Sequence, residues 1–342
     1  MLLKKITEAA GVAGDEYEVR AVIREALNGV VDDIYTDMLG NLIAVQNKAA
    51  KGPRILLDAH MDEIGLMIVF IEPTGLLRFK PVGGIDVRVL VAKTVRIGTK
   101  KIPGVIGAKA IHLQKPEERQ SPIPIESLLI DIGAKNKEEA EKIVSIGDYA
   151  VFDTDYEEFG DGKAKAKAFD DRIGCAVIVE VLKEKFTVPV YAVFSVSEEI
   201  GLRGAGTAAF VIDPQVGIAI EGCTAHDVTD VEDHLVSTHL GAGPSITLMD
   251  KSLISDKKLI ALAAKTAEEL GIPYQFRNTA TGGNDGGKIN QTRGGVAAIE
   301  LAVPTRYVHS PISIIQLSDY EQTIALVKAF IHAIERGGFE IK

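Results

Sequence analysis

Two adjacent carboxylates, Glu198 and Glu199, follow the apolar segment 191–196 and precede Gly201, where the chain must turn. A short run of apolar, β-branched and aromatic residues predicts a buried strand. Because successive side chains of a strand point in opposite directions, the two carboxylates leave the strand end on different sides. One of them can then contact a metal ion while the other contacts a water molecule beside it. A solvated loop that carries two acids is the simpler alternative.

Other acids and histidines also follow strand-like runs. They are His60, the Asp170-Asp171 pair, Glu221 and His309. Each has an ordinary explanation by itself: a hydrogen-bonded core histidine, a helix cap, a solvated strand end or a surface loop. Together, however, two imidazoles and at least three carboxylates suit a pair of divalent metal ions that share a bridging carboxylate. The strand ends of an open α/β sheet are also where ligands tend to bind.

Asp62 stands two residues after His60. In an extended segment both side chains lie on the same side, so Asp62 can accept a hydrogen bond from the second ring nitrogen of His60.

Cys175 and Cys223 are the only cysteines, and neither has C-x-x-C spacing. The sequence therefore predicts neither a cysteine-held structural zinc site nor a disulfide framework, and it favours a reducing compartment.

The bulk composition excludes several classes of protein. The 342 residues are enough for two domains, or for one domain with an insertion, and a content of 46% hydrophobic and 25% charged residues is ordinary for a globular protein. The net charge of −10 argues against nucleic acid as a main partner, because phosphate binding needs basic patches. No apolar run is long enough to span a bilayer, and the N-terminus lacks the apolar core of a signal peptide. We therefore expect a cytoplasmic protein without a membrane partner.

Strand-like and helix-like segments must position these residues, and they alternate on both sides of the middle of the chain. Predicted helices cover residues 2–10, 17–27, 172–185, 205–211, 257–270 and 318–335, the last beginning with a capping box at 318–321. Predicted strands cover residues 34–36, 42–46, 188–195, 216–221 and 296–301, and a further strand leads into His60. Lys163, Lys165 and Lys167 alternate with alanine, which predicts one solvated strand face.

The sequence pattern changes from about residue 72. Short β-like segments alternate there with Gly and Pro turns, and one short helix is predicted near residues 137–144. Such close turns suit a small barrel or sandwich. We therefore predict an α/β fold in which residues 1–71 and 163–342 form one domain, interrupted by a β domain over residues 72–162.

The segments that carry the candidate ligands resemble a known family. Residues 58–65, 168–172, 197–204 and 306–311 resemble, in order, the signature blocks of the family forty-two metallopeptidases. These are the tetrahedral (TET) and glutamyl aminopeptidases, some of which carry the label endoglucanase. Further blocks that resemble this family are residues 129–134, 147–148 and 281–285. The resemblance runs nearly end to end and includes the β insertion.

The resemblance implies a mixed-sheet, phosphorylase/hydrolase-like zinc exopeptidase domain with an inserted small β barrel. It also implies two divalent metal ions in each subunit, with zinc as the expected metal and cobalt or manganese as alternatives. The implied roles are a bridging ligand (Asp170), further ligands of one ion (His60, Glu221) and of the other (Glu199, His309), a general base (Glu198) and a partner that orients His60 (Asp62). Glu221 stands where many relatives have Asp, which keeps the charge on a longer arm.

The implied activity is the removal of N-terminal residues from short peptides. A free amino terminus would need an acidic or metal-lined cradle, to which Asp285 could contribute unless it only shapes its Gly-rich turn. The resemblance further implies that the β insertion forms dimers, and that the dimers build a hollow tetrahedral dodecamer.

Three other functions compete with this interpretation. A metal-dependent deacylase would use the same ions. An endoglucanase could use two carboxylates as acid and base, but it would leave both histidines without a role, and the chain has no Trp to stack on sugar rings. A non-enzymatic assembly or metal-storage protein would leave Glu198 without a role.

Overall fold

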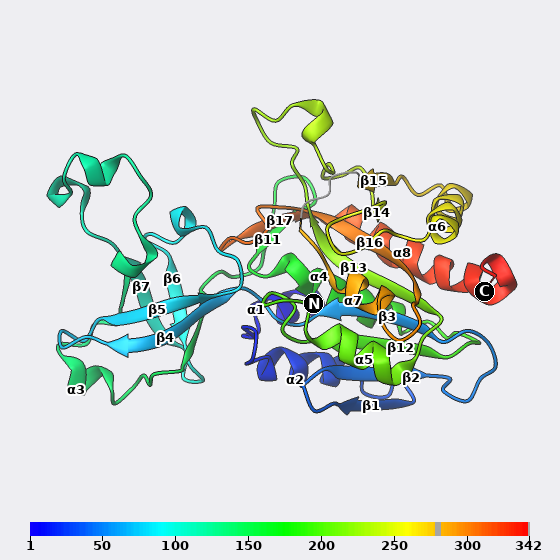
Figure 1. Ribbon diagram of the computed structural model, residues 1–342, viewed down its shortest axis with the longest axis horizontal. Helices are drawn as coiled ribbons and strands as arrows, with labels where there is room; N and C mark the ends of the chain where they lie inside the picture. Colours follow the sequence, from blue (N-terminus) through cyan, green and yellow to red (C-terminus); the bar gives the residue numbers. More distant parts are fainter. Residues whose placement is uncertain (278–281, 341–342) are drawn as a thin grey trace.

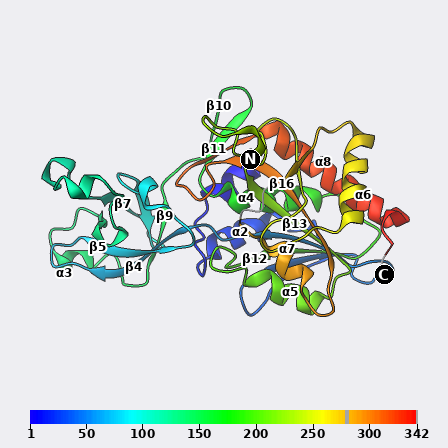
Figure 2. The same ribbon diagram turned by 45° about the horizontal axis from the view of Figure 1, so that its top comes forward.

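The computed structural model describes residues 1–277 and 282–340. These residues form an α/β domain and a closed β barrel that stands to one side of it (Figure 1). The two bodies stay separate when the molecule is turned (Figure 2), so the predicted α/β fold with an inserted barrel is confirmed. No helix in the described ranges combines the length and the hydrophobicity that a bilayer span requires.

The α/β domain is built on one mixed sheet. Among the described residues its strand order is β1-β2-β12-β3-β13-β16-β17-β11-β10, with β14 and β15 attached beside β16. The strands are β1 (Asp33–Thr36), β2 (Leu42–Gln46), β3 (Ile55–His60), β10 (Glu157–Phe159), β11 (Lys163–Ala166), β12 (Val190–Ser195), β13 (Val216–Thr224), β14 (Ser245–Thr247), β15 (Gln275–Arg277), β16 (Ala297–Arg306) and β17 (Ser313–Gln316). The central strands β12, β3, β13 and β16 run parallel, and β3 pairs with β12 in the register Ser195 to His60.

Helices cover both faces of this sheet. They are α1 (Leu2–Glu8), α2 (Tyr17–Ala26), α4 (Phe169–Val181), α5 (Gly204–Ile212), α6 (Lys257–Leu270), α7 (Asp285–Asn290) and α8 (Leu317–Ala333). Apolar residues of α1, α2, α4, α6 and α8 share one core with the sheet, whereas α5 and α7 pack on the opposite face. The fold is therefore a three-layer sandwich of helices, sheet and helices.

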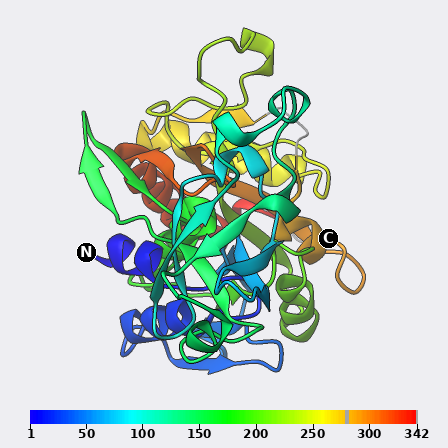
Figure 3. The ribbon, with the colours of Figure 1, turned by 90° about the vertical axis from the view of Figure 1, so that its left-hand side faces the viewer.

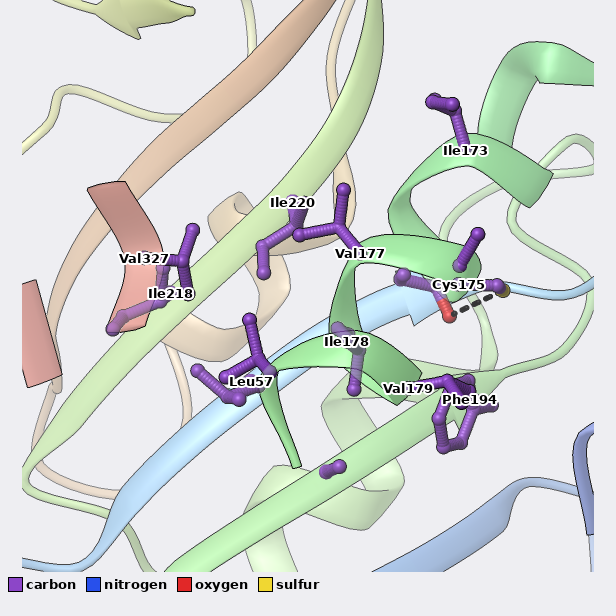
Figure 4. Close-up of a cluster of buried hydrophobic side chains, with 14 of the residues drawn as sticks. Leu57, Ile173, Cys175, Val177, Ile178, Val179, Phe194, Ile218, Ile220 and Val327 are labelled. Carbon is purple, nitrogen blue, oxygen red and sulfur yellow. Dashed lines mark hydrogen bonds between the residues drawn. The ribbon is translucent and has the colours of Figure 1, made fainter. Parts of the chain in front are cut away.

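The helix α4 is the centre of the larger core. Its residues Ile173, Val177 and Ile178 are fully buried, and the helix packs on β3 and β13. Figure 4 shows Val177 beside Ile220 of β13 and Ile178 near Leu57 of β3. A helix that is apolar nearly all round belongs in the interior of a domain. Because Asp170 lies in its first turn, the packing of α4 also fixes the position of a predicted metal ligand.

The barrel closes in the order β4-β5-β8-β7-β6-β9, and all its pairs are antiparallel. Its elements are β4 (Gly65–Ile71), β5 (Leu77–Val82), β6 (Thr94–Ile97), β7 (Ile102–Gly107), β8 (Leu129–Asp131), α3 (Lys137–Ala140) and β9 (Tyr149–Phe152). It has its own apolar core, and Figure 3 views the molecule from the barrel side. The strand β4 precedes residue 72, where the predicted insertion begins, because the chain enters the barrel directly after the loop that follows β3.

Two local predictions are wrong. The last helix begins at Leu317 with Gln316 as its N-cap, and no side chain caps it, so the predicted capping box at 318–321 lies inside the helix. The cause is that β17 runs straight into α8, and sheet pairing sets the start of the helix. Lys167 is only 3% exposed, so it does not share the partly exposed strand face of Lys163 and Lys165.

Candidate metal centre

The parallel strands bring their carboxyl ends to one edge of the sheet, and the predicted site residues meet there. They are His60 (last residue of β3), Glu198 and Glu199 (after β12), Glu221 (in β13), His309 (after β16) and Asp170 (first turn of α4). The local backbone is unusual: Ala168, Ser197 and His309 have φ values of 56°, 58° and 58°. Non-glycine residues rarely adopt this conformation, and it concentrates at functional sites.

One group of ligand atoms is formed by His60, Asp170 and Glu221, whose donor atoms lie within 4.8 Å of one another. The Nε2 atom of His60 is 3.2 Å from Oδ1 of Asp170 and 3.9 Å from Oε2 of Glu221. The other oxygen of Glu221 is buried and has no hydrogen-bond partner among the described residues. A buried carboxylate oxygen normally has a partner, so a cation between these side chains would satisfy it.

A second group is formed by Asp170, Glu199 and His309. The Nε2 atom of His309 is 3.4 Å from Oδ2 of Asp170 and 3.2 Å from Oε2 of Glu199. Asp170 therefore directs one oxygen towards each group. This is the arrangement in which one carboxylate can bridge two metal ions.

Glu198 belongs to neither group, although its Oε2 atom lies 3.9 Å from Nε2 of His60. Asp62 holds the turn that carries both glutamates, because its two carboxylate oxygens accept hydrogen bonds from the backbone N–H groups of Glu198 and Glu199 at 3.0 and 3.1 Å. The Nδ1 atom of His60 lies 3.1 Å from the backbone oxygen of Asp62 and 3.5 Å from its carboxylate. Asp62 thus contacts the imidazole and the Glu198-Glu199 turn together.

The carboxylates of the site are crowded. Burial raises the pKa of Glu198 to about 9 and that of Glu199 to about 8, and the neighbouring carboxylates add to both shifts while the histidines oppose them. Burial also raises the pKa of Asp170, but hydrogen bonds from His309 and His60 outweigh burial, so its pKa falls below the usual range. The hydrogen bond to Asp170 raises the pKa of His309 to about 9. Divalent cations would replace these protons, so the N/O donor set fits two such ions.

The barrel contributes a glycine turn to this site. Gly83 and Gly84 follow β5, and Gly83 has a φ of 86°. A Cβ atom on Gly84 would lie 3.2 Å from Nδ1 of His309, and one on Gly83 would lie 2.8 Å from Cγ2 of Ile64 and 3.3 Å from Cβ of Glu199. A side chain at Gly83 would therefore be strained and would clash with Ile64, and one at Gly84 would require His309 to shift by a few tenths of an ångström.

The site opens into a cleft of about 510 Å³. Asp170, Glu198, Glu199, Glu221 and His309 line one side of it. On the other side lie Asn284, which belongs to the predicted block 281–285, and two residues that sequence reasoning missed, Arg277 and Glu300. Arg277 donates a hydrogen bond to Glu300 at 2.8 Å, and Asn284 donates one to Glu300 at 2.7 Å. A glutamate within the apolar run 296–301 was the available signal, because a charge in a buried strand needs a partner.

Asp285 is not among the residues that line the cleft. Its side chain is fully buried and accepts a hydrogen bond from the Ser195 hydroxyl at 2.7 Å; the same hydroxyl lies 3.3 Å from Asp58, whose carboxyl also hydrogen-bonds that of Asp285. From this buried position Asp285 can support the carboxyl ends of the strands more readily than it can contact a peptide. Thr281, which belongs to the same predicted block, lies outside the described residues.

Comparison with known proteins gives a consistent result. A sequence model of the M42 glutamyl aminopeptidases matches residues 40–326. The lysyl aminopeptidase of Pyrococcus furiosus is 34% identical over 342 residues, which is 98% of this chain and 97% of that protein. The aminopeptidase APDkam598 of Desulfurococcus kamchatkensis is 37% identical, with a TM-score of 0.95 over 100% of this chain and 96% of that one. The Pyrococcus horikoshii TET1 peptidase, described as assembling into a tetrahedron or a large octahedral shell, is 34% identical, with a TM-score of 0.85 over 96% and 98% of the two chains.

Proposed function

Because the chain belongs to the M42 glutamyl aminopeptidase family, we propose that it is a dinuclear metal-dependent aminopeptidase that removes N-terminal residues from short peptides. The observation that carries this proposal is the position of Asp170 between two imidazoles, with one carboxylate oxygen directed at each group of ligands. A carboxylate in that position serves a pair of ions, and a pair of ions suits peptide hydrolysis.

The residues of the two groups divide the ligation between them. His60 and Glu221 would hold one ion, Glu199 and His309 the other, and Asp170 would bridge them. We propose zinc as the metal, with cobalt or manganese as alternatives, because imidazole and carboxylate donors suit all three. When bound, the two ions would polarise the scissile carbonyl and make water a nucleophile at neutral pH.

Glu198 is the proposed general base. It faces the cleft, and it stands outside both groups of ligands, so its carboxylate is available for proton transfer. It removes a proton from the attacking water and returns one to the departing amine, which would otherwise be a poor leaving group. Asp62 positions this base, because it holds the backbone N–H of Glu198 while it also contacts His60.

The test is a substrate panel. Aminoacyl p-nitroanilides, an N-acetylated amino acid and carboxymethyl-cellulose are offered to the purified protein with and without a chelator. We expect hydrolysis of the anilides alone, loss of that activity with the chelator, and its return with added zinc, cobalt or manganese. Cleavage of cellulose, or anilide hydrolysis that survives complete removal of metal, would contradict the proposal.

We also propose that the chain is cytoplasmic, that it forms dimers through the barrel, and that the dimers assemble into a tetrahedral dodecamer. The analogy for this assembly is with TET1 structures described as a dodecamer and as assembling into a tetrahedron. Light scattering coupled to gel filtration measures the mass directly. A monomer at micromolar concentration would contradict the proposed assembly without affecting the proposed chemistry.

A further inference from the structure

A buried ion cluster, formed by Glu63, Lys167 and Arg172, lies beside the metal centre. Their exposed fractions are 1%, 3% and 0%. Each member is close in sequence to a site residue: Glu63 directly follows Asp62, while Lys167 and Arg172 stand on either side of Asp170. We refer to these three residues as the Glu63 cluster.

Glu63 is held by both cations. The Lys167 ammonium lies 2.7 Å from one of its carboxylate oxygens and 2.8 Å from the other, and the Arg172 guanidinium lies 3.1 Å from the first. These contacts join the segment that follows β3 to Lys167, just before α4, and to Arg172 in the first turns of α4. The two regions are more than a hundred residues apart in sequence; the first directly follows the proposed ligand His60, and the second contains the proposed ligand Asp170.

The N-terminal segment completes the cluster. Arg172 donates hydrogen bonds to the backbone oxygens of Ile6, Ala9 and Gly11 at 2.7, 3.1 and 3.3 Å, and Lys167 donates one to Ala9 at 2.9 Å. The carbonyl groups at the end of α1 lack helical partners, so these two cations satisfy them. The guanidinium fills this space tightly, because a Cβ atom on Gly11 would lie 2.6 Å from its Nη2 atom.

The backbone transmits these contacts to the site. The N–H of Glu63 donates to the backbone oxygen of Gly11 at 2.9 Å, so the whole residue is fixed and not only its side chain. The preceding residue, Asp62, holds the Glu198-Glu199 turn and contacts His60. A displacement of Glu63 would therefore also displace Asp62, and with it proposed ligands of both groups.

An ionic cluster is not the most stable way to fill such a space, because apolar residues of similar volume often stabilise a core equally well. Charged hydrogen bonds differ from apolar packing in that they set direction as well as distance. We infer that Lys167 and Arg172, through Glu63, are positioning residues that hold the two ligand-bearing segments in register for metal binding. This inference rests on the proposed metal centre, and it assigns a role in that centre to the N-terminal segment.

The test replaces Lys167 by methionine, which keeps a long side chain and removes the charge. The matched control is Lys165→Met, two residues earlier, because the Lys165 ammonium lies 2.6 Å from the exposed carboxylate of Glu157 at the surface. Zinc dissociation constants are measured by competition with a chelator, and melting temperatures are measured on the metal-free proteins. We expect Lys167→Met to weaken zinc binding about 10-fold, the lower end of the loss that follows removal of a direct partner of a metal ligand, because Lys167 acts through Glu63 and Asp62. Lys165→Met should leave the dissociation constants within about twofold.

Further variants separate positioning from packing. Glu63→Gln keeps the shape and one acceptor oxygen, so it should fold and still weaken zinc binding, and Lys167→Arg should restore affinity because it keeps the charge. The visible spectrum of the cobalt-loaded protein reports ligand geometry, and it should change in Lys167→Met and not in Lys165→Met. If both Lys167→Met and Glu63→Gln lower the melting temperature and leave the zinc affinity unchanged, this inference is wrong and the proposed function is unaffected. A wild-type protein that binds none of zinc, cobalt and manganese would instead overturn the proposed function.

Discussion

Replacing Glu198 by glutamine tests the proposed chemistry most directly. The substitution keeps the shape of the side chain, and the backbone N–H that donates to Asp62 at 3.0 Å remains. Because Glu198 belongs to neither group of ligands, the variant should bind the same number of ions as the wild type. It loses only the ability to accept a proton from water.

The expected size of the effect follows from that role. General base catalysis contributes about 10²- to 10⁴-fold in rate. At about 1.4 kcal/mol for each tenfold change, the barrier should rise by about 3–5 kcal/mol. The turnover number on an aminoacyl p-nitroanilide should fall by that factor, while the Michaelis constant should change little because Glu198 is not expected to bind the peptide.

The measurement pairs steady-state kinetics with elemental analysis of the same samples. Glu199→Gln is the matched control: it makes the same chemical change at the next residue, and it should lower the metal content because Glu199 is a proposed ligand. A fully metal-loaded Glu198→Gln variant with a turnover number within tenfold of the wild type would refute the assignment of the base.

Three further predictions concern the ligands, the pH dependence and the core. His309→Ala removes a ligand of the second group only, so the metal content should fall from about two ions per chain to about one; retention of both ions in elemental analysis would count against the assignment. In the metal-free protein, burial raises the pKa of Glu199 to about 8 and that of Glu198 to about 9, so the native state keeps protons that the unfolded chain releases above about pH 4.5. Its melting temperature should therefore decline as the pH rises from about 5 to about 9, and bound zinc should make this decline smaller. A melting temperature of the chelated protein that increases over that pH range would contradict the prediction. Ile178→Ala leaves a cavity in the fully buried face of α4 and should lower the free energy of unfolding by about 2–5 kcal/mol in urea titrations, and a loss below about 1 kcal/mol would show that the core relaxes around it.

The site was predictable to a large extent because its chemistry lies where strands end. His60, Glu199 and Glu221 each follow or end an apolar run, and parallel pairing of those runs is enough to bring them together. The alternation of strand-like and helix-like segments also predicted the α/β domain. The density of glycine and proline predicted a small barrel or sandwich, and the family resemblance implied the barrel.

Other features depend on tertiary contacts that no local pattern contains. Lys167 continues an alternating lysine pattern, and only the distant Glu63 explains why its side chain is buried. The residues at 318–321 have the right spacing for a capping box, but the preceding strand already sets the start of α8. Arg277 and Glu300 form the far wall of the cleft through a pairing across 23 positions, which periodicity cannot reveal.

The glycine turn after β5 places the inserted barrel directly against two of the proposed metal ligands. An insertion that served only to join subunits could be shortened, exchanged or deleted by a protein engineer without changing the chemistry. Here such an exchange would also remove the backbone that rests against His309 and Glu199, unless the donor barrel brought the same Gly83-Gly84 pair in the same place. Chimeras designed to alter the quaternary state should therefore keep this dipeptide from the host.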